Sequence, residues 1–303
     1  MTLFFAFGIK TIFDTIVLMA LVWDPSPFIF TIPKVEWPIS WYGFLFAVGF
    51  YLGLFLFGRL LRQTLAFRLN LAPSELKYKA RALSDSLLVY AIIGAVVGSR
   101  LFHILFYENV SEYVSEPLRI FQVWEGGLAS HGGVLGLIVA VFLFYTFRKK
   151  ELAPVRFFGL MDLVSIPTMM VCSFIRVGNF INQEILGVPY NGLFSVLFLR
   201  PRDDAGILPR HPVQLYESLF YILLAAFLFL LWRKFYRSWA EGQLFSIGLI
   251  LAFTFRFCIE FIKTEQSVWL SAQSLLMGQY LSIPMVLLGI ALLVQRRRTA
   301  LLK

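Results

Sequence analysis

The chain has 303 residues, of which 59% are hydrophobic and only 15% are charged, and its mean hydropathy is +0.76. A soluble domain carries about 25% charged residues, so this composition excludes an ordinary soluble globular protein. The formal net charge of +9 indicates basic cytoplasmic loops that lie against anionic lipid, rather than a nucleic-acid partner. The length accommodates roughly seven membrane-spanning helices of about 20 residues each, joined by short loops.

Residues 1–39 precede the first clear span and form a segment of their own. Residues 1–23 are apolar but contain Lys10 and Asp14, and they show neither the basic start nor the cleavage site of a signal peptide. We expect an extra helix here that lies in or dips into the membrane interface. Residues 24–38 contain four prolines, which predicts an extended extracytoplasmic lead-in.

Residues 40–295 read as a bundle of transmembrane helices, and residues 296–303 as a basic cytoplasmic tail. The seven predicted spans are 40–58, 86–107, 128–147, 162–182, 213–232, 242–262 and 278–295. The connecting segments on one side of the membrane carry seventeen Lys and Arg residues, and those on the other side carry five. The positive-inside rule makes the first side cytoplasmic, so the C-terminus is expected inside and the start of the first span outside. We therefore predict an all-α polytopic membrane protein.

Three arginines, Arg100, Arg176 and Arg256, fall within predicted spans. They lie too deep in the membrane for the positive-inside rule to explain them. A charge at that depth is expensive unless it is paired or faces a wet cavity. Each either pairs with an acid or a helix end in a structural role, or it binds a ligand, and Arg100 is the best structural candidate. Arg176 and Arg256 share the outer half of the bilayer, where two cations would repel each other without an anion between them. A lipid phosphate is the natural candidate for that anion.

The stretch from Ser173 to Gly187 is the most polar interruption of an apolar run. If the helix continues through it, Arg176, Asn179 and Gln183 lie on one face. Gly178 would allow a head group or a neighbouring helix to approach the backbone. The stretch also contains Asn182 and Glu184, and we interpret it as a polar site inside a membrane bundle.

Two histidines stand at the outer ends of predicted spans. His131, with glycine pairs on both sides, is either a hydrogen-bonding strut or a general base. His211 precedes Pro212 and is weighted below His131, because it has the simpler role of fixing the start of a helix.

Further polar residues also map to the outer half of the bundle. Glu217 lies inside the apolar run that follows Pro212, where Arg176 or Arg256 would neutralise it. Tyr42 is either an aromatic-belt residue or a site residue. Glu260, one turn beyond Arg256, is positioned to pair with it. The two cysteines, Cys172 and Cys258, read as small hydrophobes rather than a disulfide or a metal site.

Taken together and in this order, the motifs resemble those of the bacterial prolipoprotein diacylglyceryl transferase family. The resemblance covers roughly residues 41–284, and its core is Arg-x-Gly-Asn-Phe-x-Asn at residues 176–182. The other motifs are Trp41-Tyr42-Gly43, Gly98-Ser99-Arg100, Trp124-Glu125-Gly126-Gly127, His131-Gly132-Gly133, Arg210-His211-Pro212, Gln214-Leu215-Tyr216-Glu217, Phe255-Arg256 and Glu260-Phe261. The chain departs from the enterobacterial pattern at Gln183 (there Gly) and Ala252 (there Tyr), in a short loop before Arg210 and in its N-terminal segment. The Ala252 difference puts one hydroxyl near the site in doubt.

The resemblance implies transfer of the diacylglyceryl group of phosphatidylglycerol to the lipobox cysteine of a preprolipoprotein, with release of glycerol phosphate. It implies a bacterial inner-membrane enzyme with its site toward the outer leaflet and no metal or other cofactor. His131, Arg176 and Arg256 would be catalytic. Substrate binding would fall to Arg176, Tyr42, Asn179, Glu184, Glu217 and Gly187, supported by Arg100, Asn182, His211, Tyr216 and Glu260.

Two other classes of function are compatible with intramembrane arginines. A transporter or scramblase for anionic lipid would bind the lipid phosphate without catalysing a reaction. An inverted sequence repeat would favour this class of function, and no convincing repeat is present. A purely structural membrane subunit would not explain why the polar motifs gather in one leaflet. Lipid flux without a thioether product would favour the transporter.

Overall fold

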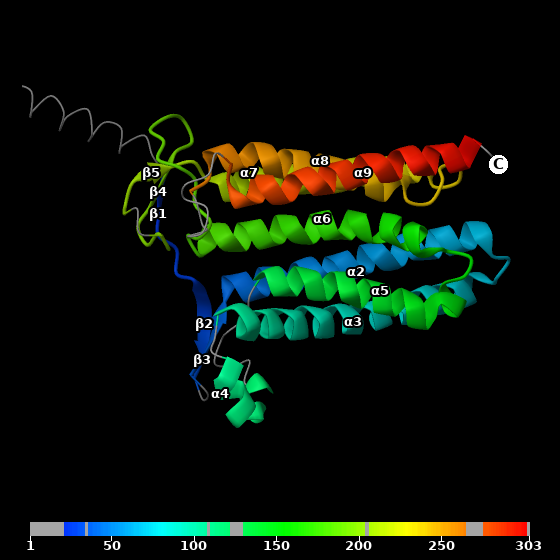
Figure 1. Ribbon diagram of the computed structural model, residues 1–303, viewed down its shortest axis with the longest axis horizontal. Helices are drawn as coiled ribbons and strands as arrows, with labels where there is room; N and C mark the ends of the chain where they lie inside the picture. Colours follow the sequence, from blue (N-terminus) through cyan, green and yellow to red (C-terminus); the bar gives the residue numbers. More distant parts are fainter. Residues whose placement is uncertain are drawn as a thin grey trace, which may run out of the picture. The chain divides into compact units, whose positions relative to one another are not determined.

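The computed structural model describes residues 21–33, 36–107, 110–121, 130–203, 206–264 and 275–301. Its long helices are α2 (Trp41–Arg68), α3 (Pro73–Tyr107), α5 (Ser130–Leu152), α6 (Phe157–Ile181), α7 (Val213–Phe235), α8 (Gln243–Ile259) and α9 (Met277–Leu301). The shorter elements are α4 (Val110–Ser115), the 3-10 helices η1 (Pro117–Phe121) and η3 (Glu260–Ile262), and the strands β1 (Leu21–Trp23), β2 (Phe28–Ile32), β3 (Trp37–Ser40), β4 (Val196–Phe198) and β5 (Pro209–Arg210). Figure 1 shows their order along the chain. The chain divides into two compact units, residues 1–53 with 164–303 and residues 54–163.

The predicted polytopic fold is confirmed. Within the described residues, six helices are long and apolar enough to cross a membrane, and α5 is a seventh that coincides with the predicted span 128–147. Two helices run further than the apolar runs indicated, because α2 continues to Arg68 and α3 begins at Pro73. The basic segment 59–85 is therefore mostly helical. Lys and Arg are good helix formers, so charge ends the apolar span without ending the helix.

The N-terminal prediction is corrected in part. Residues 21–23 form strand β1 rather than the end of a helix, and residues 1–20 lie outside the described part of the chain. The lead-in is extended, as its prolines indicated, and it contains the antiparallel hairpin of β2 and β3. The hairpin runs directly into α2, and the Trp41 N–H donates to the carbonyl of Pro27 at 3.0 Å.

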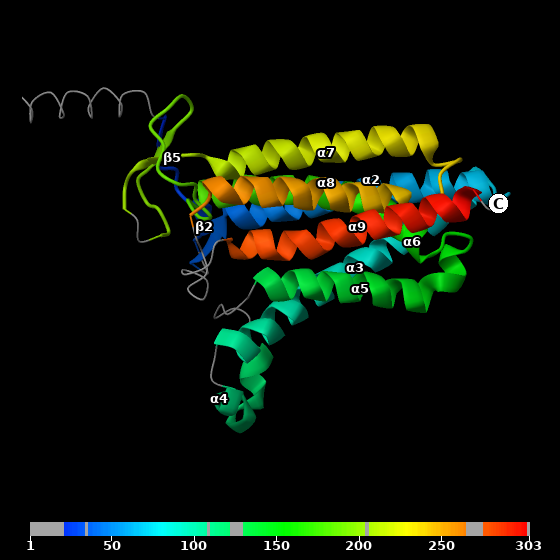
Figure 2. The same ribbon diagram turned by 45° about the horizontal axis from the view of Figure 1, so that its top comes forward.

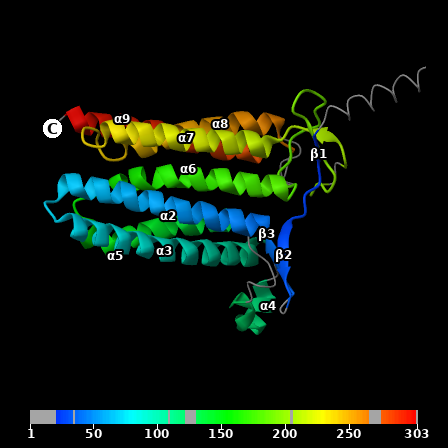
Figure 3. The ribbon, with the colours of Figure 1, turned by 180° about the vertical axis from the view of Figure 1, so that it is seen from behind.

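In the unit of residues 54–163, α3 and α5 run side by side, as Figure 3 shows. Their backbones meet at two glycine pairs, Gly94 with Gly98 on α3 and Gly132 with Gly136 on α5. A Cβ on Gly98 would lie 2.7 Å from the Cα of Gly136, and one on Gly94 would lie 2.5 Å from the carbonyl oxygen of Gly136. Small residues spaced four apart permit this close approach of helices in a membrane.

In the other unit, α7, α8 and α9 run alongside one another (Figures 1 and 2). The first half of α2 packs on α6, where a Cβ on Gly49 would lie 3.0 Å from the Cβ of Phe174. Beyond the end of α6, three short strands form a sheet in the order β1-β4-β5, with β1 parallel to β4. Strand β4 contributes Val196 and Phe198 to a small apolar cluster with Phe180 of α6 and Leu186, and Trp23 of β1 packs against this cluster.

Candidate functional site

The site is centred on Arg176, in the second-to-last turn of α6. One nitrogen of its guanidinium donates to Asn179 Oδ1 at 2.9 Å, one turn further along the helix. Its Nε lies 3.1 Å from Glu217 Oε2, which comes from α7. The Glu217 side chain is fully buried and that of Arg176 is 15% exposed. Glu217 therefore pairs with Arg176, one of the two partners that its position in an apolar run predicted.

The second oxygen of Glu217 has its own cation, which was not among the predicted site residues. Lys263 Nζ donates to Glu217 Oε1 at 2.8 Å, and its side chain is 4% exposed. Lys263 directly follows η3. Its position immediately after an apolar helix is the sequence signal that distinguishes it from other loop lysines. Burial lowers the pKa of Lys263, and the charge of Glu217 opposes that shift. The buried carboxylate thus lies between two cations from different elements.

An amide network continues from Arg176 to Glu184. Asn179 Nδ2 donates to Glu184 Oε1 at 2.7 Å, and Asn182 Nδ2 lies 3.5 Å from the same oxygen. The main-chain carbonyl of Glu184 accepts a hydrogen bond from Gln214 Nε2 at 2.8 Å. Arg176, Asn179 and Glu184 therefore form one hydrogen-bonded chain, so that Glu184 fixes the guanidinium indirectly.

Gln183 departs from the expectation that it shares a face with Arg176. Helix α6 ends at Ile181, and Gln183 has a φ of 54°. Its side chain turns away to accept a hydrogen bond from the Arg200 main-chain N–H at 2.7 Å. A left-handed residue breaks the helical spacing on which the expectation depended.

Tyr42 lies against this network from α2. A Cβ on Gly178 would sit 2.7 Å from Tyr42 Cδ2, so the glycine is what admits the ring. The phenol interacts with the Asn179 side chain and with the charges of Glu184 and Arg176. The close approach predicted at Gly178 is confirmed, and the neighbouring group is an aromatic side chain of another helix.

Arg256 lies in the last turn of α8 and is partly buried. Its guanidinium has no hydrogen bond or ion pair with any residue that the structure describes. Its charge acts on Lys263, as does that of Arg176, and both lower the pKa of that ammonium. The predicted pairing of Glu260 with Arg256 is wrong, because Glu260 begins η3, where its Oε2 is 3.9 Å from Lys263 Nζ.

Gly187, His211 and Tyr216 belong to the loop structure beside the network. Gly187 forms a bridge with Lys263, and a Cβ on it would lie 2.5 Å from the His211 carbonyl oxygen. The His211 ring stacks on Tyr190 with centroids 3.8 Å apart, and its Nδ1 is 3.5 Å from the Tyr216 hydroxyl. Partial burial lowers the pKa of His211. These contacts fit the role of fixing the start of α7.

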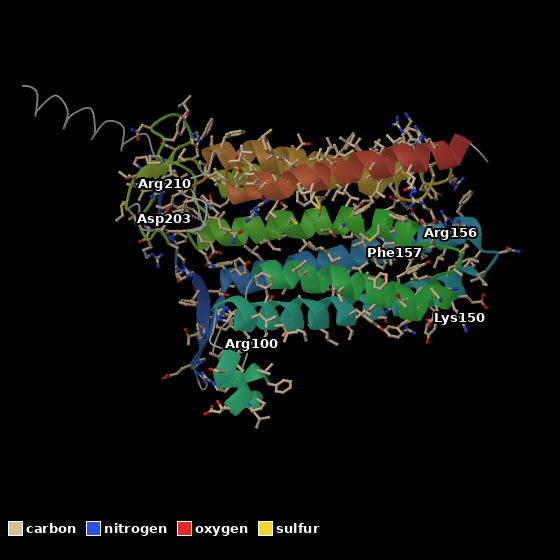
Figure 4. All side chains as sticks on the ribbon, viewed as in Figure 1. Arg100, Lys150, Arg156, Phe157, Asp203 and Arg210 are labelled. Atoms are coloured by element: carbon tan, nitrogen blue, oxygen red, sulfur yellow. The ribbon has the colours of Figure 1, made fainter. Side chains whose placement is uncertain are left out.

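The loop before α7 is itself held by a buried arginine. Arg210, which is fully buried, donates to both carboxylate oxygens of Asp203 at 3.0 and 3.1 Å and to the Gly206 carbonyl at 3.0 Å. Figure 4 shows Arg210 beside Asp203 in this loop. Deeper in the bundle, the hydroxyls of Ser173 and Ser218 lie 2.9 Å apart and join α6 to α7. Neither this pair nor Asp203 was anticipated from the sequence.

Two of the predicted site residues belong to the unit of residues 54–163. Arg100 donates to the carbonyls of Ile120 and Arg119 at 3.1 and 2.7 Å, which is the structural role expected of it (Figure 4). His131 is the second residue of α5, and its side chain lies outside the described part of the structure.

Comparison with known proteins identifies the family to which this site belongs. A model of the prolipoprotein diacylglyceryl transferase family matches residues 27–295. The chain belongs to this family. A phosphatidylglycerol–prolipoprotein diacylglyceryl transferase of Tolumonas auensis is 40% identical over 90% of this chain and 96% of its own length. Proteins of the same name from Chloroherpeton thalassium and Protochlamydia amoebophila are 38% and 32% identical, over 93% and 90% of this chain and 97% and 94% of their own lengths. The chain is thus a membrane transferase of the diacylglyceryl transferase family.

Proposed function

We propose that this protein transfers the diacylglyceryl group of phosphatidylglycerol to the lipobox cysteine thiol of preprolipoproteins. The observation that carries the proposal is the guanidinium of Arg176, held by Glu217 and Asn179 at the end of an apolar span. A fixed cation in a region of low dielectric stabilises a phosphate more strongly than it would in water. The names of the relatives supply the two substrates.

The reaction exchanges one bond to a glyceryl carbon for another. The cysteine sulfur attacks the carbon that carries the phosphate ester, a carbon–sulfur bond forms, and the carbon–oxygen bond breaks. The electron pair of the broken bond leaves on the phosphate oxygen, so the products are a thioether and glycerol phosphate. The thiol proton goes to a base, because the thiolate is the nucleophile.

Arg176 and Arg256 bind the phosphate and stabilise the charge that grows on it. Glu217 holds the Nε side of Arg176 and Asn179 one of its terminal nitrogens, which leaves other guanidinium N–H groups for a ligand. The Arg256 guanidinium has no ion pair in the described part of the chain, so a phosphate would be its counterion. Tyr42, Asn179, Glu184 and Gly187 line the glycerol side of the same site, and we assign His131 as the base.

The localisation follows from the loop charges. The seventeen-to-five distribution of Lys and Arg supports a cytoplasmic C-terminus and an α6 terminus at the outer leaflet, which we propose is that of the bacterial inner membrane. A signal peptide delivers its cysteine to that leaflet. The same reasoning favours a transferase over a scramblase, which would need the lipid to reach both leaflets.

The test is a transfer assay with purified protein, phosphatidylglycerol vesicles and a lipobox peptide. We expect the peptide to gain the mass of one diacylglyceryl unit and glycerol phosphate to appear in equal amount. His131→Gln and Arg176→Ala are each expected to lower turnover by about 100-fold or more, a loss typical of a base or a charge-stabilising group. Wild-type turnover in both variants would refute the mechanism. Lipid movement between leaflets with no thioether product would refute the transferase itself.

A further inference from the structure

The polar turn that carries Glu184 is supported from outside the residues that the family model matches. Residues 182–185 include two non-glycine residues with positive φ, Gln183 at 54° and Ile185 at 58°. Such conformations are strained and persist only where the surroundings hold them. The turn connects Asn179 at the end of α6 to its hydrogen-bond partner Glu184. The shape of the turn therefore determines whether the hydrogen-bonded chain from Glu184 through Asn179 to Arg176 can form.

One group of contacts to this region comes from residues 21–25, which we call the strap. The strap lies N-terminal to the family match at residue 27. Its strand β1 pairs with β4 in parallel, with Trp23 opposite Phe198. The Leu21 N–H donates to the Ser195 carbonyl at 3.0 Å, and the Leu199 N–H donates to the Trp23 carbonyl at 3.2 Å. Strands this short do not hold a sheet together on their own, so side-chain contacts must fix the strap.

Trp23 is the side chain that fixes the strap to α6. Its indole Nε1 donates to the carbonyl of Phe180 at 3.0 Å, and its ring centroid lies 4.5 Å from that of Phe180. Phe180 is adjacent to Asn179 and one residue from the end of α6, where helix carbonyls lack the usual intrahelical partners. Asp24 adds an ion pair of 2.5 Å with Arg200.

The strap also reaches the turn along a second route. The segment that follows β4 carries Arg200, whose main-chain N–H donates to the Gln183 side chain at 2.7 Å. The Arg202 N–H donates to the Gln183 carbonyl at 3.0 Å. The strap thus holds the last turn of α6 through Trp23, and it holds Gln183 through β4.

We propose that Trp23 is a positioning residue for the transfer reaction. The strap keeps the strained turn in the shape that joins Glu184 to Asn179, and through Asn179 it keeps the Arg176 guanidinium aligned for the phosphate. Trp23 itself touches neither substrate. This inference rests on the proposed function, because the transfer reaction is what the experiment measures.

The test compares Trp23→Phe and Trp23→Ala with the wild type in the transfer assay. Trp23→Phe keeps an aromatic ring, although a smaller one, and removes the indole N–H. We expect kcat to fall about fivefold, mainly from the loss of one hydrogen bond of ordinary strength. For Trp23→Ala we expect a fall of roughly 20-fold or more, because the ring contact is lost as well. KM for phosphatidylglycerol should stay within about twofold, because misalignment of a group that acts in the transition state lowers kcat. Hydrogen exchange at residues 182–186 should become faster in both variants.

Trp239→Phe is the matched control. Trp239 follows the opposite end of α7 and stacks on Phe235 with centroids 4.4 Å apart. The same substitution there should leave both kcat and exchange at residues 182–186 unchanged. If the Trp23 variants lower only the melting temperature or the yield of folded protein, and folded enzyme turns over at the wild-type rate, Trp23 is merely structural and the inference is wrong. If the wild type also makes no thioether, the proposed function fails instead.

Discussion

At the scale of single residues, the site is organised by one buried carboxylate with two cations. One carboxylate oxygen of Glu217 accepts a hydrogen bond from Lys263, and the other forms an ion pair with Arg176. Removing either cation would leave a buried charge poorly compensated, which is strongly destabilising. The pairing of Glu217 with an intramembrane arginine was predictable, because an acid in an apolar run needs a cation. Lys263 was not predicted as a site residue, because the positive-inside rule treats every loop lysine alike, as a marker of orientation.

Lys263 gives the reaction a pH dependence that can be tested by substitution. Burial lowers its pKa, so this ammonium loses its proton below the ordinary range of lysine, and Glu217 then has only Arg176. We expect kcat/KM to decline on the alkaline side as that proton is lost. In Lys263→Arg the alkaline limb should move to higher pH, because a guanidinium keeps its charge throughout the accessible range.

The control for this prediction is Lys234→Arg, near the C-terminus of α7, where the ammonium lies 5.1 Å from the centroid of the Phe235 ring. Its pH profile should match that of the wild type. An alkaline limb that is unchanged in Lys263→Arg would show that another group titrates there.

At the scale of elements, glycines decide which helices touch. The α3–α5 contact depends on backbone meeting backbone at Gly94, Gly98, Gly132 and Gly136. Gly132, next to His131, packs against Gly98 and Phe102 of α3. Strand β1 was not predictable in the same way. Its apolar residues continue the run of residues 1–20, and only the distant contacts of Trp23 with Phe180 and of β1 with β4 select a strand.

Gly136→Leu tests the helix contact. A Cβ at residue 136 would lie 2.7 Å from the Gly94 carbonyl carbon, so the larger side chain must push α3 away from α5. We expect the free energy of unfolding to fall by about 1–3 kcal/mol or more, the usual cost of overpacking. The unfolding midpoint in detergent measures this. Leu135→Ala, at a side chain on the same helix that is 54% exposed, should change it little, and an equal loss in both variants would contradict the prediction.

At the scale of the whole molecule, the sequence predicted the seven long helices found among the described residues, in their order, but not all of their ends. Hydropathy indicates which residues lie in the apolar part of the membrane, whereas backbone hydrogen bonding determines where a helix ends. Helices α2 and α3 therefore extend beyond their apolar runs. The bundle-forming helices and the Arg176 site follow from composition and motif. The loop of residues 182–212 could not be predicted, because its shape depends on residues such as Gln183 and Ile185 with positive φ and on long-range bonds such as that between Arg210 and Asp203.

The orientation of the molecule is the prediction on which access of the substrate depends. In a variant with both native cysteines changed to alanine, Phe194→Cys places a thiol in the loop that follows α6, and Tyr78→Cys places one near the start of α3. These side chains are 80% and 78% exposed, so they are matched in accessibility. We expect a membrane-impermeant maleimide to label the first in intact spheroplasts and the second only after lysis, because the positive-inside rule predicts that the basic segments face the cytoplasm. The reverse pattern would place Arg176 at the inner leaflet, where a translocated lipobox cysteine does not arrive, and the proposed reaction could not proceed at this site.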